Sequence, residues 1–177
     1  MSKNLEESGL KSIVSEYDLF FIDIWGVLHN GIKLYENAVK VLEELSNNEK
    51  KFILLTNAPR PNQTVINTLK KMGLNNFYDT VFTSGEASKR YLLENFNNKK
   101  FFHLGPPRDF DLFKTFEDNK VLNIDDSDYL LCSGLFEEHE DDLGYYKKLL
   151  SKHITKKMIC TNPCLLYTSP SPRDMWT

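Results

Sequence analysis

The chain has 177 residues, of which 41% are hydrophobic and 27% are charged, and its formal net charge is -3. This length suits one ordinary domain, or a small core with part of a second module, and the composition excludes a disordered chain. Acidic and basic residues are mixed, which argues against a nucleic-acid partner, and no apolar run approaches the roughly 20 residues of a membrane helix, so we expect a cytoplasmic protein.

The first part of the chain alternates between helical and strand-like patterns. Residues 10–17 have apolar side chains at helical spacing, and residues 18–24 are almost continuously apolar, which is typical of a fully buried strand. The elements expected next are a helix over 35–45 with an apolar stripe at Ala38, Val41, Leu42 and Leu45, a strand over 51–58, a helix over 62–73 that stops at Gly73, a strand over 78–84 and a helix over 85–96.

The same alternation continues through the second part of the chain. The pattern predicts a strand over 100–105, a short helix over 109–116, a strand over 127–134, a helix over 145–152 and a strand over 156–162. Helices of this length between strands favour parallel sheets built from right-handed crossovers. The sequence therefore predicts an α/β fold.

The three cysteines, Cys132, Cys160 and Cys164, do not have the spacing of a metal site. The first two lie in apolar runs, where a small buried thiol is the ordinary interpretation. We expect reduced thiols and no disulfide framework.

Polar residues follow each of the first three expected strands. Asp23 ends the first, Thr56 and Asn57 end the second, and residues 83–85 end the third. In a parallel sheet these ends lie at one edge, where ligands bind. A carboxylate there could attack phosphorus if Mg²⁺ screened the charges, Gly26 allowed a sharp turn and the Thr56 hydroxyl held a phosphoryl oxygen. By itself, an aspartate after an apolar run is more often a helix cap or turn former.

The motifs at these strand ends resemble those of a known family. The segments "DIWGVL" (23–28), "LLTNAPR" (54–60) and "TSGEA" (83–87) are similar to the first motifs of the haloacid dehalogenase superfamily. The similarity is to the IIA branch, which includes nucleotide, phosphoglycolate and pyridoxal phosphatases. Within it, the match is to a subgroup whose first motif carries Trp and whose second reads Thr-Asn-Ala-Pro-Arg.

The resemblance implies a domain organisation. Residues 1–90 would form part of a Rossmann-like core with an incomplete parallel sheet, and residues 91–163 would form an incomplete inserted α/β cap of the C2 type. The sheet and cap would belong to a Mg²⁺-dependent, phosphatase-like hydrolase that acts on a small phosphorylated metabolite through an aspartyl phosphate.

The resemblance also implies roles for individual residues. Asp23 would be the nucleophile and a Mg²⁺ ligand, and the backbone carbonyl of Trp25 would be the second ligand. Trp25, Gly26, Thr56 and Asn57 would surround the phosphoryl group.

Trp25 departs from the pattern of the family's phosphatases, which usually have an aspartate there as general acid and base. Losing such a group typically costs about 10² to 10⁴ in rate, so a non-catalytic binder of phosphometabolites is the alternative. Dehalogenases of the superfamily also carry an aromatic residue there. Their cap, however, follows the first motif, whereas here the large insertion follows the third strand.

Weaker candidates have ordinary structural interpretations. His29 and Asn30 could touch substrate or replace part of the missing acid, but they more often occupy a polar turn. Arg108 could reach a substrate anion, although a loop arginine is usually solvated. The acidic run 137–142 lacks the central glycine of a calcium loop and is expected to precede a helix.

The C-terminal segment 164–177 breaks the rhythm of strands and helices. Residues 164–174 match a translated frame of a common transposase-based sequencing adapter. We therefore expect a non-native tail on a truncated chain that lacks the family's lysine and acidic metal motif, and an inactive fragment. The alternative is a natural flexible tail.

Overall fold

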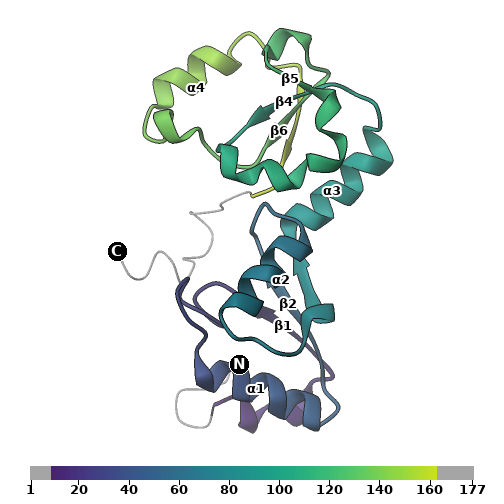
Figure 1. The fold of residues 1–177 in the computed structure, drawn as a ribbon, viewed down its shortest axis with the longest axis vertical. Helices are drawn as coiled ribbons and strands as arrows, with labels where there is room; N and C mark the ends of the chain where they lie inside the picture. The colour runs from purple at the N-terminus through teal and green to yellow at the C-terminus, as the bar shows by residue number, and fades with distance from the viewer. Residues whose placement is uncertain (1–8, 163–177) are drawn as a thin grey trace.

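The structure is a computed structural model, and it describes residues 9–162 of the chain. The described residues form two parallel sheets, which lie one above the other in Figure 1. The first sheet has the strand order β1 (Leu19–Asp23), β2 (Lys51–Thr56) and β3 (Val81–Thr83). The second sheet has the strand order β5 (Lys120–Val121), β4 (Phe101–Leu104), β6 (Tyr129–Cys132) and β7 (Lys157–Cys160). Because every strand pairing within them is parallel, the predicted α/β fold is confirmed.

Helices connect the strands as the sequence pattern predicts. The α-helices of the described residues are α1 (Glu36–Asn47), α2 (Asn62–Lys71), α3 (Ser84–Asn95) and α4 (Leu143–Leu150). The shorter 3₁₀ helices are η1 (Leu10–Ser12), η2 (Val14–Glu16), η3 (Tyr78–Thr80), η4 (Pro107–Leu112), η5 (Lys114–Asn119), η6 (Ile124–Asp126) and η7 (Glu137–His139). No helix within residues 9–162 has the length and apolar character that a membrane crossing requires.

A hydrophobic core joins the first sheet to its helices. Leu42 and Leu45 of α1 and Leu69 of α2 are buried together with Leu54 of β2. Leu42 and Leu45 belong to the apolar stripe predicted over 35–45, and Ala38 of that stripe packs against this core, although Val41 is 39% exposed. Burial of such side chains provides most of the favourable free energy of packing.

Strand β1 is less buried than its sequence predicts. Phe20 and Ile22 pack against the core, but Leu19 and Phe21 on the opposite face are 44% and 65% exposed among the described residues. The prediction of a fully buried strand is therefore wrong here. Its physical reason is that β1 is an edge strand that pairs with β2 alone within this sheet.

Three segments that the sequence predicts as α-helix or strand form 3₁₀ helices in part. Residues 10–17 form η1 and η2, which Ile13 separates with a ψ of -6° and a φ of -126°. Residues 78–80 form η3 rather than the start of a strand, after Phe77 adopts a left-handed φ of 69°. The expected short helix over 109–116 is split between η4 and η5, and the two-residue strand β5 is too short for a sequence pattern to reveal.

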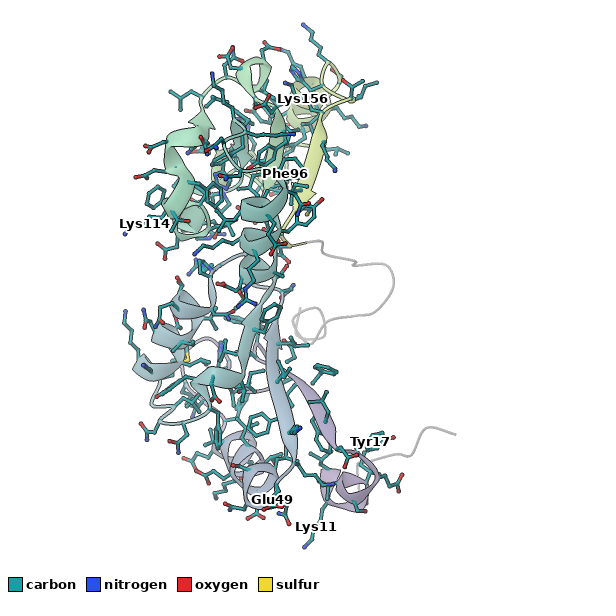
Figure 2. All side chains as sticks on the ribbon, turned by 90° about the vertical axis from the view of Figure 1, so that its right-hand side faces the viewer. Lys11, Tyr17, Glu49, Phe96, Lys114 and Lys156 are labelled. Atoms are coloured by element: carbon teal, nitrogen blue, oxygen red, sulfur yellow. The ribbon has the colours of Figure 1, made fainter. Side chains whose placement is uncertain are left out.

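The second sheet is covered on both faces. One cluster includes Phe101, Phe113 and Tyr129, and another includes Leu130 and Tyr146. In Figure 2, the labelled Phe96 lies where α3 reaches this sheet, and its ring centroid is 4.6 Å from that of Tyr129. Helix α3 therefore leads from the first sheet directly into the packing of the second.

Hydrogen bonds and an ion pair also join the two sheets near the start of α3 and in the loops beside it. The contacts are Asn57 Nδ2 to Asn162 Oδ1 at 3.0 Å, Thr64 Oγ1 to Asp111 Oδ2 at 3.1 Å, Ser84 Oγ to the Thr161 carbonyl, and Arg60 Nε to Asp109 Oδ1 at 3.6 Å. On the first sheet's side, all four come from the loop after β2, from α2 or from the start of α3. The carboxyl edge of the first sheet is thus held against the second. The predicted tail, residues 164–177, lies outside the described residues.

Candidate active site

Asp23 is the last residue of β1 and lies in register with Leu55 of β2. Its side chain is exposed at the carboxyl edge of the first sheet, and Oδ1 accepts a hydrogen bond from the Ile24 N–H at 2.8 Å. Partial burial raises the pKa of Asp23 above its usual value, while the Ile24 N–H and the charge of His29 act in the opposite direction. The carboxylate is therefore oriented through one oxygen.

The chain turns tightly after Asp23. Gly26 has a left-handed φ of 78°, and its N–H donates to the His29 carbonyl at 2.8 Å. The Leu28 N–H donates to the Ile24 carbonyl at 2.9 Å, which closes the turn. The glycine is needed because most other residues adopt such a φ only with strain. This turn brings the backbone of Trp25 to the same edge as Asp23.

The Trp25 side chain packs inside this turn region. Its ring meets the ring of His29 edge to face, with centroids 5.3 Å apart, and a Cβ added to Gly31 would lie 2.6 Å from the indole. Trp25 remains 46% exposed. Gly31, with a φ of 90°, therefore leaves room for the indole.

His29 is buried in the same turn, and its ring is held in one tautomer. Nδ1 accepts the Gly31 N–H at 2.8 Å, which places the proton of the neutral ring on Nε2. Burial lowers the pKa of His29, and the negative charge of Asp23 opposes that effect. A protonated ring would lose the hydrogen bond from Gly31. This geometry argues against His29 as a replacement for the missing general acid.

Thr56 ends β2 and Asn57 follows it at the same edge of the sheet, but the two residues have different partners. Thr56 Oγ1 accepts the Ala58 N–H at 3.2 Å, which leaves the hydroxyl proton to donate elsewhere. Asn57 is exposed and donates to Asn162 Oδ1 at 3.0 Å. Asn57 therefore also joins the first sheet to the second through Asn162. Its position in the sequence did not suggest this contact.

Thr83 and Ser84 serve the structure rather than a ligand. Thr83 is completely buried, its hydroxyl donates to the Arg60 carbonyl at 2.5 Å, and it accepts the Glu86 N–H at 2.9 Å. Ser84 donates to the Thr161 carbonyl. The expectation that the third strand end offers its hydroxyls to a ligand is thus wrong. Thr83 and Glu86 form the Thr-x-x-Glu pattern of a helix N-cap. This pattern in the sequence could have indicated that Thr83 caps α3.

Gly85 allows the loop after β2 to lie against the start of α3. A Cβ added at Gly85 would lie 2.2 Å from the Arg60 nitrogen and 2.5 Å from its carbonyl carbon and oxygen. The Gly85 N–H also donates to the Ala58 carbonyl at 3.0 Å. Backbone atoms cannot move aside as a flexible side chain does, so this contact fixes the loop that follows Thr56.

Replacing Gly85 by alanine is expected to lower the free energy of unfolding by about 1–3 kcal/mol, because the added methyl group overpacks this contact. Denaturant unfolding of the chain measures the effect. Gly144→Ala in the first turn of α4 is the matched control, since its added Cβ would meet only the Asp142 side chain, at 3.2 Å. Equal stability of the two variants would contradict the close contact.

A chain of polar side chains runs from the first sheet into the second. Arg60 pairs with the buried Asp109, Asp109 is hydrogen-bonded to Ser133, and Ser133 Oγ lies 2.9 Å from His103 Nε2. Burial raises the pKa of Asp109, although Ser133 and the two arginines Arg60 and Arg108 oppose this. No sequence signal linked these residues. They connect the loop after β2 to the carboxyl ends of β4 and β6.

His103 is expected to make the chain less stable in acid. Burial, aided by the charge of Lys120, lowers the pKa of His103 to about 4, while an unfolded histidine titrates near pH 6.5. The unfolded chain therefore binds the proton first, and stability that is fully present above pH 6.5 falls by about 3 kcal/mol as the pH drops to 4. His103→Gln should flatten this slope in unfolding measurements, whereas His139→Gln should retain it.

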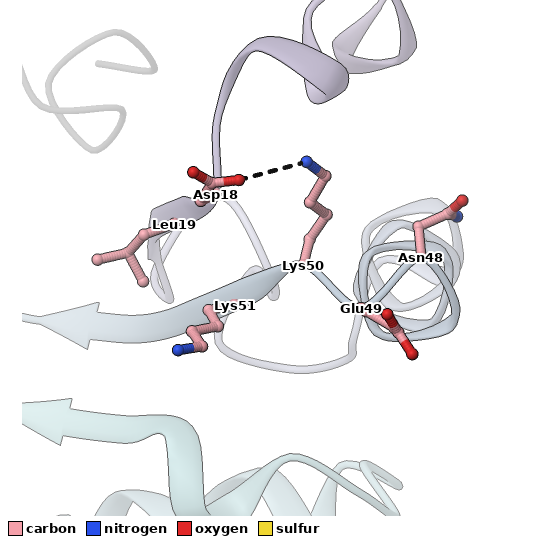
Figure 3. A pocket seen from close by; sticks show the side chains of 6 residues that line it. All are labelled: Asp18, Leu19, Asn48, Glu49, Lys50 and Lys51. Atoms are coloured by element: carbon pink, nitrogen blue, oxygen red, sulfur yellow. Dashed lines mark ion pairs between the residues drawn. The ribbon is translucent and has the colours of Figure 1, made fainter.

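A pocket among the described residues lies away from this chemistry. It has a volume of about 660 Å³ and is lined by the residues drawn in Figure 3: Asp18, Leu19, Asn48, Glu49, Lys50 and Lys51. Lys50 Nζ lies 3.8 Å from Asp18 Oδ1 across it. These residues lie at the amino ends of β1 and β2. Ligands of parallel sheets bind at the opposite, carboxyl ends, so we do not assign the active site to this pocket.

The oxygen atoms at the carboxyl edge of the first sheet are of the type that binds a hard divalent cation. Asp23 offers a carboxylate oxygen and Trp25 a backbone carbonyl, both of the type that Mg²⁺ prefers, and Mg²⁺ commonly keeps several waters beside one or two carboxylates. Within residues 9–162, no three His, Cys, Asp or Glu side chains gather as a preformed metal site.

The remaining candidates have structural partners. Arg108 pairs with Glu137 at 2.5 Å, and both side chains are largely exposed. The acidic run ends at Asp142, whose side chain accepts the Tyr145 N–H at 2.9 Å as the N-cap of α4. The interpretation of this run as a helix start is confirmed. Asn30 Oδ1 accepts the N–H groups of Ile32 and Lys33, as expected in a polar turn.

Comparisons with known proteins agree with this arrangement. A family model described as haloacid dehalogenase-like hydrolase matches residues 20–117, more than half of the chain. A haloacid dehalogenase-like hydrolase from Brucella suis 1330 is 27% identical with a TM-score of 0.74, over 87% of this chain and 59% of its own. A 4-nitrophenylphosphatase from Thermotoga maritima is 27% identical with a TM-score of 0.60, over 84% of this chain and 56% of its own.

A more distant structure shows the same fold. A glycerol phosphate phosphatase from Mycobacterium tuberculosis, solved in complex with calcium, is 17% identical with a TM-score of 0.57, over 84% of this chain and 44% of its own. The chain thus spans between 44% and 59% of the length of these structures. A search of curated proteins found no match.

Proposed function

Since the chain belongs to the haloacid dehalogenase-like hydrolases, we propose that it carries the nucleophile and phosphate loop of a Mg²⁺-dependent phosphatase that acts on a small phosphorylated metabolite. The observation that carries the proposal is the position of Asp23. Its exposed carboxylate ends a parallel strand beside Thr56, at the edge that faces the second sheet. A phosphatase-like activity also agrees with the 4-nitrophenylphosphatase among the similar structures.

Asp23 would act through the carboxylate oxygen that is not bound to the Ile24 N–H. This oxygen attacks phosphorus, and the bond from phosphorus to the leaving oxygen breaks, which gives an aspartyl phosphate and an alcohol. The leaving oxygen takes its proton from water, because Trp25 carries no acid. Water then attacks the phosphorus and restores the carboxylate with release of inorganic phosphate.

Thr56 would bind a phosphoryl oxygen during both steps. Its Oγ1 already accepts the Ala58 N–H, so the hydroxyl proton can be donated to the phosphoryl group. Asn57 and the backbone at Trp25 and Gly26 would surround the same group. Asp23 and the Trp25 carbonyl would hold Mg²⁺, which would screen the negative charges that meet at the phosphorus.

We further propose that residues 1–90 belong to the core and residues 91–163 to a C2-type cap of the IIA branch. In this arrangement the second sheet would select the metabolite, because its loops lie over the carboxyl edge of the first through Asn162 and Asp109. A cytoplasmic location would suit such a substrate.

A binder of phosphometabolites is the second candidate, and one observation favours it. Trp25 occupies the place of the general acid, and its ring is supported by His29 and by the space at Gly31. A site built around an indole binds an anion without assisting the departure of its leaving group.

Removal of divalent metal tests the proposed function. We expect hydrolysis of p-nitrophenyl phosphate to be lost in EDTA and restored by Mg²⁺, because the Asp23 carboxylate and the phosphoryl group repel each other without a cation. The assay uses the 177-residue chain and, since the similar structures are longer, any longer form of the protein that contains it. Activity that persists unchanged in EDTA would contradict the Mg²⁺ site.

A further inference from the structure

Two thiols lie side by side at the carboxyl end of the second sheet. Cys132 ends β6 and Cys160 ends β7, and the two residues are direct partners in the parallel register. Partners in a parallel pair point to the same face of a sheet, and neighbouring strands are about 4.8 Å apart. A disulfide needs Cα atoms roughly 4.4 to 6.8 Å apart, so the register of these strands meets that requirement.

The two thiols differ in their access to solvent. Cys160 is exposed on β7, an edge strand of the second sheet, whereas Cys132 is half-buried against the cluster that contains Leu130 and Tyr146. Cys132 Sγ also donates to the Gly134 carbonyl at 3.7 Å. Burial and the neighbouring Cys160 raise the pKa of Cys132 to about 11. An oxidant therefore reaches Cys160 first, and the half-buried thiol is the second to react.

We propose that Cys132 and Cys160 form a redox modification site, at which a small disulfide compound converts the two thiols into a reversible intrachain disulfide. Both cysteines are free thiols in the structure. The site is separate from Asp23 and does not depend on the proposed hydrolase activity.

The reaction proceeds by two exchanges. The Cys160 thiolate attacks one sulfur of the small disulfide, which forms a mixed disulfide and releases one small thiolate. The Cys132 thiolate then attacks the Cys160 sulfur, which closes the protein disulfide and releases the second small thiolate. The two protein thiols lose two electrons and two protons, and the oxidant becomes two thiols.

The position of the pair connects oxidation to the contact between the sheets. The Thr161 N–H donates to the Cys132 carbonyl at 2.8 Å, and the Thr161 carbonyl accepts the Ser84 hydroxyl. Asn162, the next residue, meets Asn57. A covalent bond between Cys132 and Cys160 would stiffen the segment from which both contacts arise.

Glutathione disulfide is the probe for this site. The full chain is used with Cys164→Ser, so that only the pair can react. We expect complete loss of both titratable thiols, a mass loss of two hydrogen atoms per chain, and a peptide linked through Cys132 and Cys160. Reduction with dithiothreitol should restore both thiols.

Single substitutions in the same background separate the two steps. Cys132→Ser should stop at one glutathione bound to Cys160, and Cys160→Ser should react far more slowly than the chain with both thiols. Alanine at either position should give the same result, which excludes an effect of the serine hydroxyl. Two glutathiones per chain, a stable mixed disulfide beside a free Cys132, or a disulfide between chains would each overturn the proposal.

Discussion

Replacing Asp23 by asparagine is expected to lower kcat for p-nitrophenyl phosphate on the order of 10⁴-fold or more, because an amide does not form the aspartyl phosphate intermediate. The amide is nearly the same size as the carboxylate, and its oxygen can still accept the Ile24 N–H that orients Asp23. The fold should therefore be kept. Steady-state kinetics of the protein with and without the substitution measure the loss.

Asp18→Asn is the matched control for that substitution. Asp18 precedes the other end of β1, its carboxylate is fully exposed, and it lies 3.8 Å from Lys50. We expect this variant to keep the activity of the unmodified protein. Equal activity of Asp23→Asn and Asp18→Asn would show that Asp23 is not the nucleophile.

Replacing Trp25 by aspartate is expected to raise kcat by about 10² to 10⁴ for alkyl phosphates, whose leaving oxygen needs a proton. The gain should be small for p-nitrophenyl phosphate, because its leaving group departs without one. Trp25 is 46% exposed and packs on His29, so the turn should tolerate the smaller side chain. The ratio of kcat between the two substrates is the measurement.

Trp25→Asn is the control that separates two effects of Trp25→Asp, the added acid and the space left by the indole. Asparagine also removes the ring, but it donates no proton of the required acidity. If both variants accelerate alkyl phosphate hydrolysis equally, the gain comes from space. If neither hydrolyses any substrate while inorganic phosphate still binds, the protein is a binder.

The sequence predicted the parallel sheets and the placement of Asp23 and Thr56 at one edge. These features follow from local patterns, since apolar runs and helical stripes each depend on neighbouring residues. Burial of β1 was misjudged because exposure of Phe21 depends on what covers an edge strand, and no local pattern contains that information. The 3₁₀ segments were misjudged because one residue, such as Phe77 with its left-handed φ, redirects the chain.

The candidate site was only partly predictable for a similar reason. Thr83 belongs to a helix cap whose Thr-x-x-Glu pattern can be read locally. The pairing of Arg60 with Asp109, and of Asn57 with Asn162, joins residues far apart in the chain. Such pairs depend on how the second sheet lies against the first, which a single sequence does not encode in any short segment.

The hydrogen bond between Asn57 and Asn162 would couple a ligand at the carboxyl edge of the first sheet to the position of the second sheet. The Asn57 amide nitrogen carries two N–H groups, so a ligand that used the N–H now donated to Asn162 would have to break that bond, at a cost of about 0.5–1.5 kcal/mol of its binding free energy. Linkage then requires the converse: withdrawal of Asn162 would free that N–H for a ligand. Through this one bond, binding at the first sheet and the position of the second would influence each other.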